Sequence, residues 1–539
     1  MTAPGAPPAP SGPPPPPDRP PPPPDRPPPG PPPSPPPPPQ PPPPPPPSNG
    51  AARLARWAGV VGAVLLTVAG WLGGALPRAT PAPGLGDEPW TVALWLAGTA
   101  LMVGAWWVLR RGAPSTRWAY RTAGLWALPL LAAPPLGSRD VYSYACQGWA
   151  YAHDVDPYAT GVAEAGCPWV DAVAPIWRDT PAPYGPVFVL LAALAVTLGG
   201  GLVGAVVAFR SLAVAGVLVA AVCLPGLARA AGVPTRRAAW LVLASPLVGV
   251  HLVAGAHNDA VMLGLLLPGL LVLVRRPGRP GPLLLAGALL GLAVTVKATA
   301  VVVLPFAALA AVPGRHTLRA LLRHGGWLAG GVLGAVAVTS LLSGLGLGWV
   351  GGLTRSGDSE QWTSPPTAVG FVVDYAGGLA GREPGAVPVT RAAALLLLAV
   401  AVAALWWRTW SGLRRPDQRR PGPARTPGGV RQGVTCTDAA RPRAALLGAG
   451  LALTATVVLA PVFHPWYATW PLALLAVAAA RTTWFVAPCA AAAFLTLPDG
   501  TNLARFSKAP GALAMTALTL GLTVWGVLRL RRTGAARPD

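Results

Sequence analysis

Carboxylates and aromatic rings gather in one polar stretch of an otherwise apolar chain, residues 137–185. Dense Tyr and Trp residues accompany six of the 19 acidic residues of the protein there. The six are Asp140, Asp154, Asp156, Glu164, Asp171 and Asp179. This composition suits a carbohydrate or a polar headgroup better than a hydrophobic ligand, because carboxylates accept hydrogen bonds from hydroxyl groups. We therefore take residues 137–185 as the functional centre.

Asp140 begins this stretch. It follows Arg139, directly after an apolar run that ends at Leu136. Its carboxylate is expected at the boundary between membrane and water, facing whatever a lipid headgroup presents. A helix-capping Asp is the alternative, since acidic residues are favoured where helices begin. The position alone does not decide between the two.

Two further polar positions interrupt apolar runs. His257, Asn258 and Asp259 lie between two such runs, where either a ligand contact or a hydrated turn would explain them. Lys297 is one of only two lysines, with Lys508, and lies inside GLAVTVKATAVVVLP. A cation at mid-bilayer depth costs about 2.5–3.5 kcal/mol, so it should pair, snorkel to the interface or line a wet cavity. We favour anion binding, with snorkelling as the competing interpretation.

A third polar group follows near the C-terminus. His464, Trp466 and Tyr467 add an imidazole and aromatic rings, and Arg505 and Lys508 add cations. An interfacial aromatic belt is the alternative account of the Trp and Tyr residues.

Composition sets the fold class. Hydrophobic residues make up 52% of the chain, charged residues 11%, and the mean hydropathy is +0.47. These values predict an all-α polytopic membrane protein, a bundle of about 13–15 transmembrane helices with a large first outer loop. The formal charge of +22 does not indicate nucleic-acid binding, because the Arg residues form short clusters between apolar spans.

Candidate spans were placed by length, since crossing roughly 30 Å of hydrocarbon takes about 20 apolar residues. They lie near residues 54–76, 90–109, 119–136, 186–206, 211–228, 238–256, 260–274, 281–296, 298–312, 326–348, 388–407, 444–463, 467–480, 484–497 and 510–528. Several are short and interrupted by Gly or Pro, so one or two are expected to be re-entrant.

The spans and loops define eight segments. They are a Pro-rich tail (1–50), N-terminal transmembrane helices (51–136), an outer catalytic loop (137–185), a central transmembrane bundle (186–348), a second outer loop (349–387), a transmembrane helix (388–407), a basic cytoplasmic loop (408–443) and C-terminal transmembrane helices (444–539). The tail is expected to be solvated polyproline II, either dispensable or a tether for Pro-binding modules.

Arginine clusters concentrate in cytoplasmic loops, which orients the chain. Both termini are then cytoplasmic, and all the polar segments singled out above share the outer face. Residues 186–228 do not fit this orientation, because they resemble two spans where an odd number of spans is required. We interpret one of the two as a re-entrant or interfacial helix. Cys146 and Cys167 both fall in the outer loop, where an oxidising compartment permits a disulfide.

Several of these segments resemble a known family. RDVYSYACQGWAYAHDVDPY, PAPYGPVF, GAHNDAVMLGLLL, VKATAVVVLPF and HPWY are similar to the polyprenol-phosphate-mannose-dependent α-1,6-mannosyltransferases (MptB type) of actinobacterial lipomannan and lipoarabinomannan synthesis, in the GT-C superfamily of multispanning glycosyltransferases. The resemblance covers about residues 137–470 and, more loosely, the helices after them. It does not include the Pro-rich tail, and the basic insertion 408–443 departs from it.

The resemblance implies inverting transfer of mannose from a polyprenyl phosphate donor to a glycolipid mannan acceptor in the bilayer. Asp140 matches the acidic residue that such enzymes use as base or acceptor-binding group. We expect it to act as general base, kept ionised by Arg139. Lys297, Arg505 or Lys508 would stabilise the leaving phosphate.

Sugar binding would fall to Tyr142, Tyr144, Trp149, Asp156, Tyr158 and Tyr184 in the outer loop, helped by the polar groups at 257–259 and 464–467. No metal or other cofactor is needed, because the donor carries no nucleotide diphosphate. Weak Mg²⁺ or Mn²⁺ binding by Asp140 with Asp259 is the alternative. A lipid or sugar transporter or flippase is the competing function, and a noncatalytic membrane scaffold is a third.

Overall fold

Helices make up the computed structural model, which describes residues 1, 5, 12, 48–77, 89–353, 359–414 and 436–535. Within these ranges there is no strand, only an isolated bridge between Thr496 and Asn502. Most of the Pro-rich tail and residues 415–435 of the predicted basic loop lie outside the described residues. The helical unit, Pro46–Asp539, is separate from the tail.

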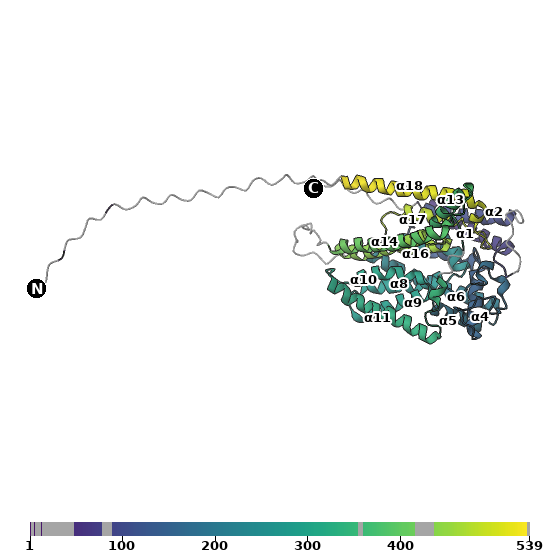
Figure 1. Cartoon of the computed structure of the whole chain (residues 1–539), viewed down its shortest axis with the longest axis horizontal. Coiled ribbons are helices and arrows are strands. Elements are labelled where there is room, and N and C mark those ends of the chain that lie inside the picture. The colour runs from purple at the N-terminus through teal and green to yellow at the C-terminus, as the bar shows by residue number, and fades with distance from the viewer. Residues whose placement is uncertain are drawn as a thin grey trace. The chain divides into compact units, whose positions relative to one another are not determined.

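Figure 1 labels many of the helices. In chain order the helices are α1 (Asn49–Gly73), α2 (Pro89–Val108), α3 (Thr116–Leu131), α4 (Asp140–Ala152), η1 (Val170–Ala172), η2 (Pro175–Trp177), α5 (Pro186–Gly199), α6 (Leu202–Ala230), α7 (Thr235–Leu243), η3 (Val248–Ala254), α8 (Asp259–Arg275), α9 (Pro280–Val296), η4 (Ala298–Val303), α10 (Leu304–Ala310), α11 (Leu318–Ser343), α12 (Trp349–Gly352), α13 (Pro365–Leu379), α14 (Ala386–Arg414), α15 (Cys436–Leu459), η6 (Pro465–Ala468), α16 (Thr469–Ala478), α17 (Thr483–Ala492), η7 (Leu503–Ser507) and α18 (Lys508–Ala535).

The predicted class, an all-α polytopic membrane protein, is confirmed. Every predicted span coincides with at least one helix. Seven described helices are long and apolar enough to cross a membrane, or eight if the bent pair α7 and η3 forms one span. This is fewer than the 13–15 expected. The remaining predicted spans hold shorter helices: the 14 residues of α5, for example, reach only about 21 Å.

Breaks between helices account for much of the difference, and they lie at the predicted polar positions. η3, a π-helix, is bent by 62° from α7, and His257 and Asn258 separate it from α8. Lys297 is extended, with φ −149° and ψ 118°, and separates α9 from η4. His464 precedes η6. Each break places a polar side chain at a helix end.

The interval 186–228 contains α5 and α6. α5 ends at Gly199, and Gly200 follows in the left-handed conformation, with φ +62°. α6 is a single helix of 29 residues. The length of α5 agrees with the expected re-entrant or interfacial helix, because it is too short to cross about 30 Å of hydrocarbon.

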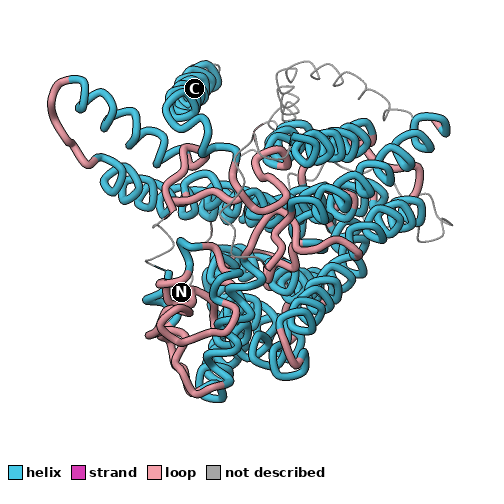
Figure 2. Tube along the Cα trace, turned by 90° about the vertical axis from the view of Figure 1, so that its right-hand side faces the viewer, coloured by secondary structure: helices cyan, strands magenta, loops and turns pink. Residues whose placement is uncertain are grey.

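Packing divides the helices into a large core and a small satellite. The large core includes Trp106 and Trp240, whose indole N–H groups donate to the carbonyls of Leu241 and of Trp106. The satellite joins α13, α14 and α18 through a small cluster around Phe371. Figure 2 shows the C-terminal helix standing apart from the main bundle. Its exposed leucines and those of α14 suit contact with lipid.

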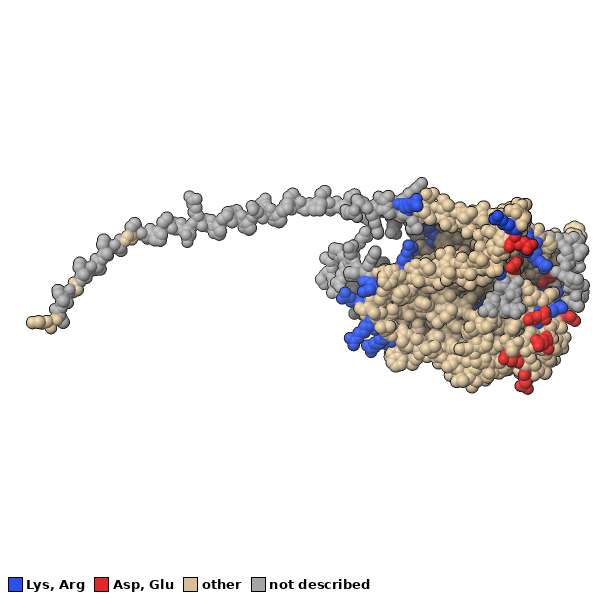
Figure 3. All heavy atoms as spheres, in the orientation of Figure 1, with Lys and Arg blue, Asp and Glu red and all other residues tan. Residues whose placement is uncertain are grey.

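Charge separates along the helical unit. Figure 3 shows Lys and Arg alone at one end, and Asp and Glu at the other end together with further basic residues. The middle is uncharged on the visible face, as expected of a surface in contact with hydrocarbon.

Candidate active site

Asp140 is the first residue of α4, a helix that sequence analysis placed in a loop. Nine of the 13 residues of α4 are buried. α4 approaches α5 closely because Gly148 has no side chain: a Cβ there would lie 2.4 Å from the backbone of Ala192. Just before α4, Gly137 adopts φ +68° and donates to the Pro498 carbonyl at 3.0 Å. These contacts fix where Asp140 enters the site.

The structure agrees only in part with the interpretation of Asp140 as a helix-capping residue. The residue lies in the first turn of α4, where the helix dipole favours negative charge. However, Arg139 is the N-cap residue, no side chain caps the helix, and the Asp140 backbone N–H donates instead to Ser138 Oγ at 3.0 Å. The Asp140 side chain is 17% exposed and faces two cavities.

His257 lies between two carboxylates. Its Nδ1 is 3.8 Å from Asp140 Oδ2 and 3.8 Å from Asp259 Oδ2, and 3.5 Å from the Tyr144 hydroxyl. The two carboxylate distances are too long for hydrogen bonds. The imidazole is completely buried, and it packs against Trp466 with ring centroids 4.2 Å apart. His257 therefore lies between the first residue of α4 and the first residue of α8, and it is too buried to contact a ligand.

Lys297 forms a buried ion pair. Its Nζ lies 2.8 and 2.9 Å from the two carboxylate oxygens of Asp259, and Trp470 Nε1 also donates to Asp259. Asp259 is fully buried and Lys297 is 9% exposed. The snorkelling interpretation is therefore wrong, and the charge of Lys297 is already balanced. A divalent cation between Asp140 and Asp259 would have to compete with this ion pair.

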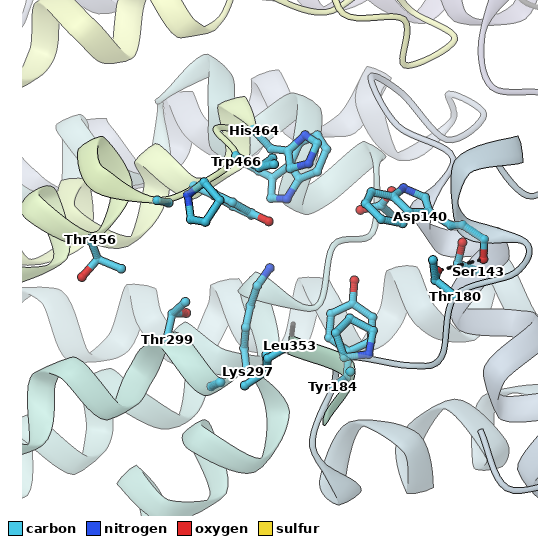
Figure 4. A pocket seen from close by; sticks show the side chains of 18 of the residues that line it. Asp140, Ser143, Thr180, Tyr184, Lys297, Thr299, Leu353, Thr456, His464 and Trp466 are labelled. Carbon is cyan, nitrogen blue, oxygen red and sulfur yellow. Dashed lines mark hydrogen bonds between the residues drawn. The ribbon is translucent and has the colours of Figure 1, made fainter. Parts of the chain in front are cut away.

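Two cavities meet at Asp140. The first has a volume of about 260 Å³ and the second about 620 Å³. Asp140, Trp177, His464 and Trp466 line both. Figure 4 shows the first cavity: Asp140, Ser143 and Thr180 lie together at one end, Thr299 and Thr456 lie at the other, and Lys297 points inward opposite His464 and Trp466.

The cavities differ in their walls. The lining of the first cavity includes a group of apolar residues: Leu395 and Leu398 of α14, Ala460, Pro461 and Val462. The second cavity is lined by charged and amide side chains: Arg139, Asp171, Arg178, Glu360, Gln361, Asp499, Asn502 and Arg505. The first cavity thus suits a ligand with an apolar part, and the second suits a polar ligand.

Burial shifts the pKa values of Asp140 and His464, which line both cavities. Loss of hydration raises the pKa of Asp140 to about 6, against the lowering effects of Ser138 and Lys297, while Asp259 raises it further. Burial lowers the pKa of His464 to about 3, with a further lowering from Lys297. At neutral pH Asp140 is therefore mostly ionised but close to titration, and His464 is neutral. We expected Arg139 to keep Asp140 ionised. The Arg139 guanidinium instead donates to the Ala172 carbonyl at 3.1 Å.

The structure brings most of the predicted site residues together. The first cavity is lined by Asp140, Tyr184, Lys297, His464, Trp466 and Tyr467, and the second by Arg139 and Arg505 as well as the shared residues. Tyr144, His257, Asn258 and Asp259 form a buried layer behind them.

Other predicted residues line neither cavity. Tyr142 is buried, and its hydroxyl donates to the Ala75 carbonyl. Asp156 accepts from the Tyr158 backbone N–H at 2.8 Å, a local turn contact. Trp149 stacks on His153 rather than facing the site. The Lys508 ammonium lies 4.6 Å from the centre of the Phe371 ring in the satellite core. Their expected contacts with sugar or phosphate have no support in this geometry.

The predicted disulfide is confirmed. Cys146 of α4 is bonded to Cys167, 21 residues later, and both are buried. The bond ties the middle of α4 to the loop that leads to Trp177, so it restrains one wall of both cavities.

Sequence analysis missed Arg210 of α6. Its guanidinium donates to the carbonyls of Leu131, Ala133 and Ala254, at 3.0, 2.7 and 2.7 Å. It thereby joins the end of α3, which leads to Asp140, to the end of η3, which leads to His257. An isolated charge inside an apolar span was the available signal, the same one that singled out Lys297. Ser143 and Gln147, which line the first cavity from α4, were also missed.

Known proteins match most of the chain. Residues 56–313 match the family model of the alpha-(1->6)-mannopyranosyltransferase N-terminal domain, and residues 434–525 match that of the MptB C-terminal domain. The chain is 31% identical over 453 residues to alpha-(1->6)-mannopyranosyltransferase A of Mycobacterium tuberculosis, with 80% of each chain covered. It is 32% identical over 473 residues to a probable alpha-(1->6)-mannopyranosyltransferase of Mycolicibacterium smegmatis, covering 80% of this chain and 79% of that one.

A third relative, alpha-(1->6)-mannopyranosyltransferase B of Corynebacterium glutamicum, is 30% identical over 411 residues, 71% of this chain and 63% of its own. No solved structure matches the chain. The resemblance found from the sequence motifs is confirmed, and mannosyl transfer is the activity common to the names of these relatives. The chain belongs to the α-(1→6)-mannopyranosyltransferase family.

Proposed function

We propose that this membrane enzyme transfers mannose from a polyprenyl phosphate donor to an α-1,6-mannan acceptor of the lipomannan type, at the outer face of the cell membrane and with inversion. The observation that carries the proposal is the meeting of two unlike cavities at Asp140, which lines both. A lipid-linked donor has a long apolar part, whereas a glycan acceptor is polar, so each matches one of the two cavities. Transfer requires that the reacting atoms of the two substrates meet.

The first cavity is the proposed donor site. Its lining includes Leu395 and Leu398 of α14, a helix of 29 residues of which only four are buried. A polyprenyl chain could therefore pass from the bilayer to this wall without crossing water. Among the described residues that line this cavity, Lys297 is the only Lys or Arg. We place the donor phosphate beside it, with Lys297 still paired to Asp259.

The second cavity is the proposed acceptor site. Its arginines, carboxylates and amides offer donors and acceptors to sugar hydroxyls. Trp177 and Trp466, shared with the first cavity, offer ring faces for sugars at the junction.

Asp140 is the proposed general base. Its carboxylate takes the proton of the acceptor hydroxyl while the hydroxyl oxygen bonds to the anomeric carbon. The bond from that carbon to the phosphate oxygen breaks, and its electron pair leaves with the polyprenyl phosphate. A pKa of about 6 suits the role, because a base is most effective when its pKa lies near the working pH.

The proposal includes no metal cofactor. Lys297 donates to both oxygens of Asp259, one of the two carboxylates that the metal alternative would use. Transfer that is unchanged by excess EDTA, and not increased by Mg²⁺ or Mn²⁺, is the expected result.

The test is reconstitution. Purified protein in nanodiscs should transfer radiolabelled mannose from polyprenyl phosphate mannose to a short α-1,6-mannoside, and the product should carry a new α-linkage by NMR. Right-side-out and inverted vesicles, assayed with an impermeant acceptor, decide the face. Absence of transfer with folded protein, or a product linkage with the same anomeric configuration as the donor, would contradict the proposal.

A further inference from the structure

Two buried polar atoms in the first cavity have no partner among the described residues. They are Ser143 Oγ and Gln147 Oε1, both on α4. Each residue is only 5% exposed, and each lines the first cavity. An unpaired buried polar atom costs about 1–3 kcal/mol, so its retention calls for an explanation.

The two residues share a helix face with Asp140. At 3.6 residues per turn, positions 140, 143 and 147 fall within about 60° of one another and extend over about 10 Å of α4. They form a polar stripe that begins at the proposed base and continues along the cavity wall. Figure 4 shows Ser143 beside Asp140 at the end of the cavity opposite Thr299 and Thr456.

The chemistry of the stripe selects its ligand. The Gln147 carbonyl oxygen accepts hydrogen bonds only, so it needs a ligand that donates. A polyprenyl chain has no donor, and an ionised phosphate offers acceptors only. Sugar hydroxyls donate and accept, and they can therefore pair with both Gln147 Oε1 and Ser143 Oγ.

We propose that Ser143 and Gln147 bind hydroxyl groups of the hexose being transferred, and so determine which donor sugar is accepted. This inference rests on the proposed function, in which the first cavity holds a polyprenyl phosphate sugar. The phosphate then lies near Lys297, and the anomeric carbon lies between it and Asp140. The sugar is recognised by the same helix that carries the base, so recognition and proton transfer share one rigid element.

Direct binding tests the proposal. The ligands are farnesyl phosphate and its mannosyl derivative, titrated into the full-length protein in nanodiscs. Ser143→Ala and Gln147→Met remove the polar atoms while keeping side-chain volume close to the original. Ser211→Ala is the matched control, because its hydroxyl donates to Val207 within α6 and lines neither cavity.

The wild type should bind the mannosyl ligand more tightly than farnesyl phosphate. Each variant should reduce that preference by about three- to tenfold, as expected for one lost hydrogen bond between uncharged groups, with the affinity for farnesyl phosphate unchanged. The Ser211→Ala variant should keep the wild-type preference. Replacing the mannosyl group with a glucosyl group should weaken wild-type binding and narrow the gap between wild type and variants.

Two results overturn the inference. One is an equal loss of affinity for both ligands, which would assign the residues to packing or to the phosphate. The other is an unchanged preference in both variants, as expected if a water molecule satisfies the two atoms. Failure of the proposed function is a separate result: the sugar preference and its loss in the variants would be seen, while mannose transfer to the mannoside acceptor would not.

Discussion

The two cavities that meet at Asp140 differ in how far their ion pairs are exposed to water. In the first, Lys297 is bonded to Asp259 in a nearly dry pair: Asp259 is fully buried and Lys297 is 9% exposed. In the second, one ion pair is open to water: the Asp171 side chain is 75% exposed, and its contact with Arg178 is 4.0 Å long. A buried charge is costly to leave unpaired, whereas an exposed ion pair contributes little. Substitutions should therefore have large effects in the first cavity and small ones in the second.

Asp140 lies at the boundary, and its replacement should have the largest effect. Asp140→Asn keeps the shape of the side chain and removes its basicity. Transfer should fall at least about a hundredfold, the lower end for general-base catalysis, with farnesyl phosphate mannose binding largely kept. Single-turnover assays at equal protein level measure this. Asp179→Asn, at an exposed acid that follows η2 and lines neither cavity, is the control. Near wild-type turnover by Asp140→Asn would move the base elsewhere.

Lys297→Met should be the most destabilising change in the first cavity. It leaves the buried Asp259 carboxylate without its partner, a loss of about 3–5 kcal/mol in comparable cases. The double variant Lys297→Met/Asp259→Asn removes both charges and should recover much of the thermal stability. Unfolding in detergent compares the three proteins. If the double variant is folded but has normal affinity for farnesyl phosphate, Lys297 does not bind the phosphate.

The raised pKa of Asp140 predicts opposite trends for turnover and stability. Turnover should fall about tenfold per pH unit below pH 6, as the base becomes protonated, and Asp140→Asn should lose this dependence. Because the pKa in the folded state exceeds the usual value of 3.8, the ionised form destabilises the fold. Stability is favoured below pH 4 and lost as pH rises through 6. Asp140→Asn should therefore melt at a higher temperature than the wild type at pH 7–8, and the difference should vanish near pH 4.

Arg505→Ala should have the smallest effect. The side chain is exposed and lines only the second cavity. Its loss should raise the acceptor KM about two- to fivefold, as expected for an exposed charged contact, without changing donor affinity. Steady-state kinetics with each substrate varied in turn separate the two. A large loss of donor affinity instead would mean that the cavities are not divided between donor and acceptor.

Hydropathy predicted where the helices lie but not how long they are. Lys297 shows why: its apolar neighbours continue on both sides, yet the helix breaks there and the side chain pairs with Asp259, 38 residues earlier. Such pairing is tertiary and leaves no local pattern. α4 was not predicted because its polar and aromatic composition is typical of a loop. Nine of its residues are nevertheless buried, and this burial depends on contacts that are not visible in the local sequence.

The candidate site was predictable where a polar side chain ended or interrupted an apolar run. Asp140, Lys297 and His464 were found in this way, and all three line a cavity. Aromatic residues were less predictable because their direction depends on an unpredicted helix. Tyr142 is two residues from Asp140 and so points about 200° around α4, away from the cavities. With α4 assigned, the spacing of 143 and 147 from 140 would have identified both residues.

The disulfide between Cys146 and Cys167 also bears on the biogenesis of the enzyme. Such a bond forms where thiol oxidants act, outside the reducing cytoplasm. If the loop is exported as proposed, its catalytic end matures only after translocation, and a copy inserted the wrong way round would keep both thiols. The oxidation state of this one pair, read by alkylation and mass spectrometry, thus records for each molecule whether membrane insertion succeeded.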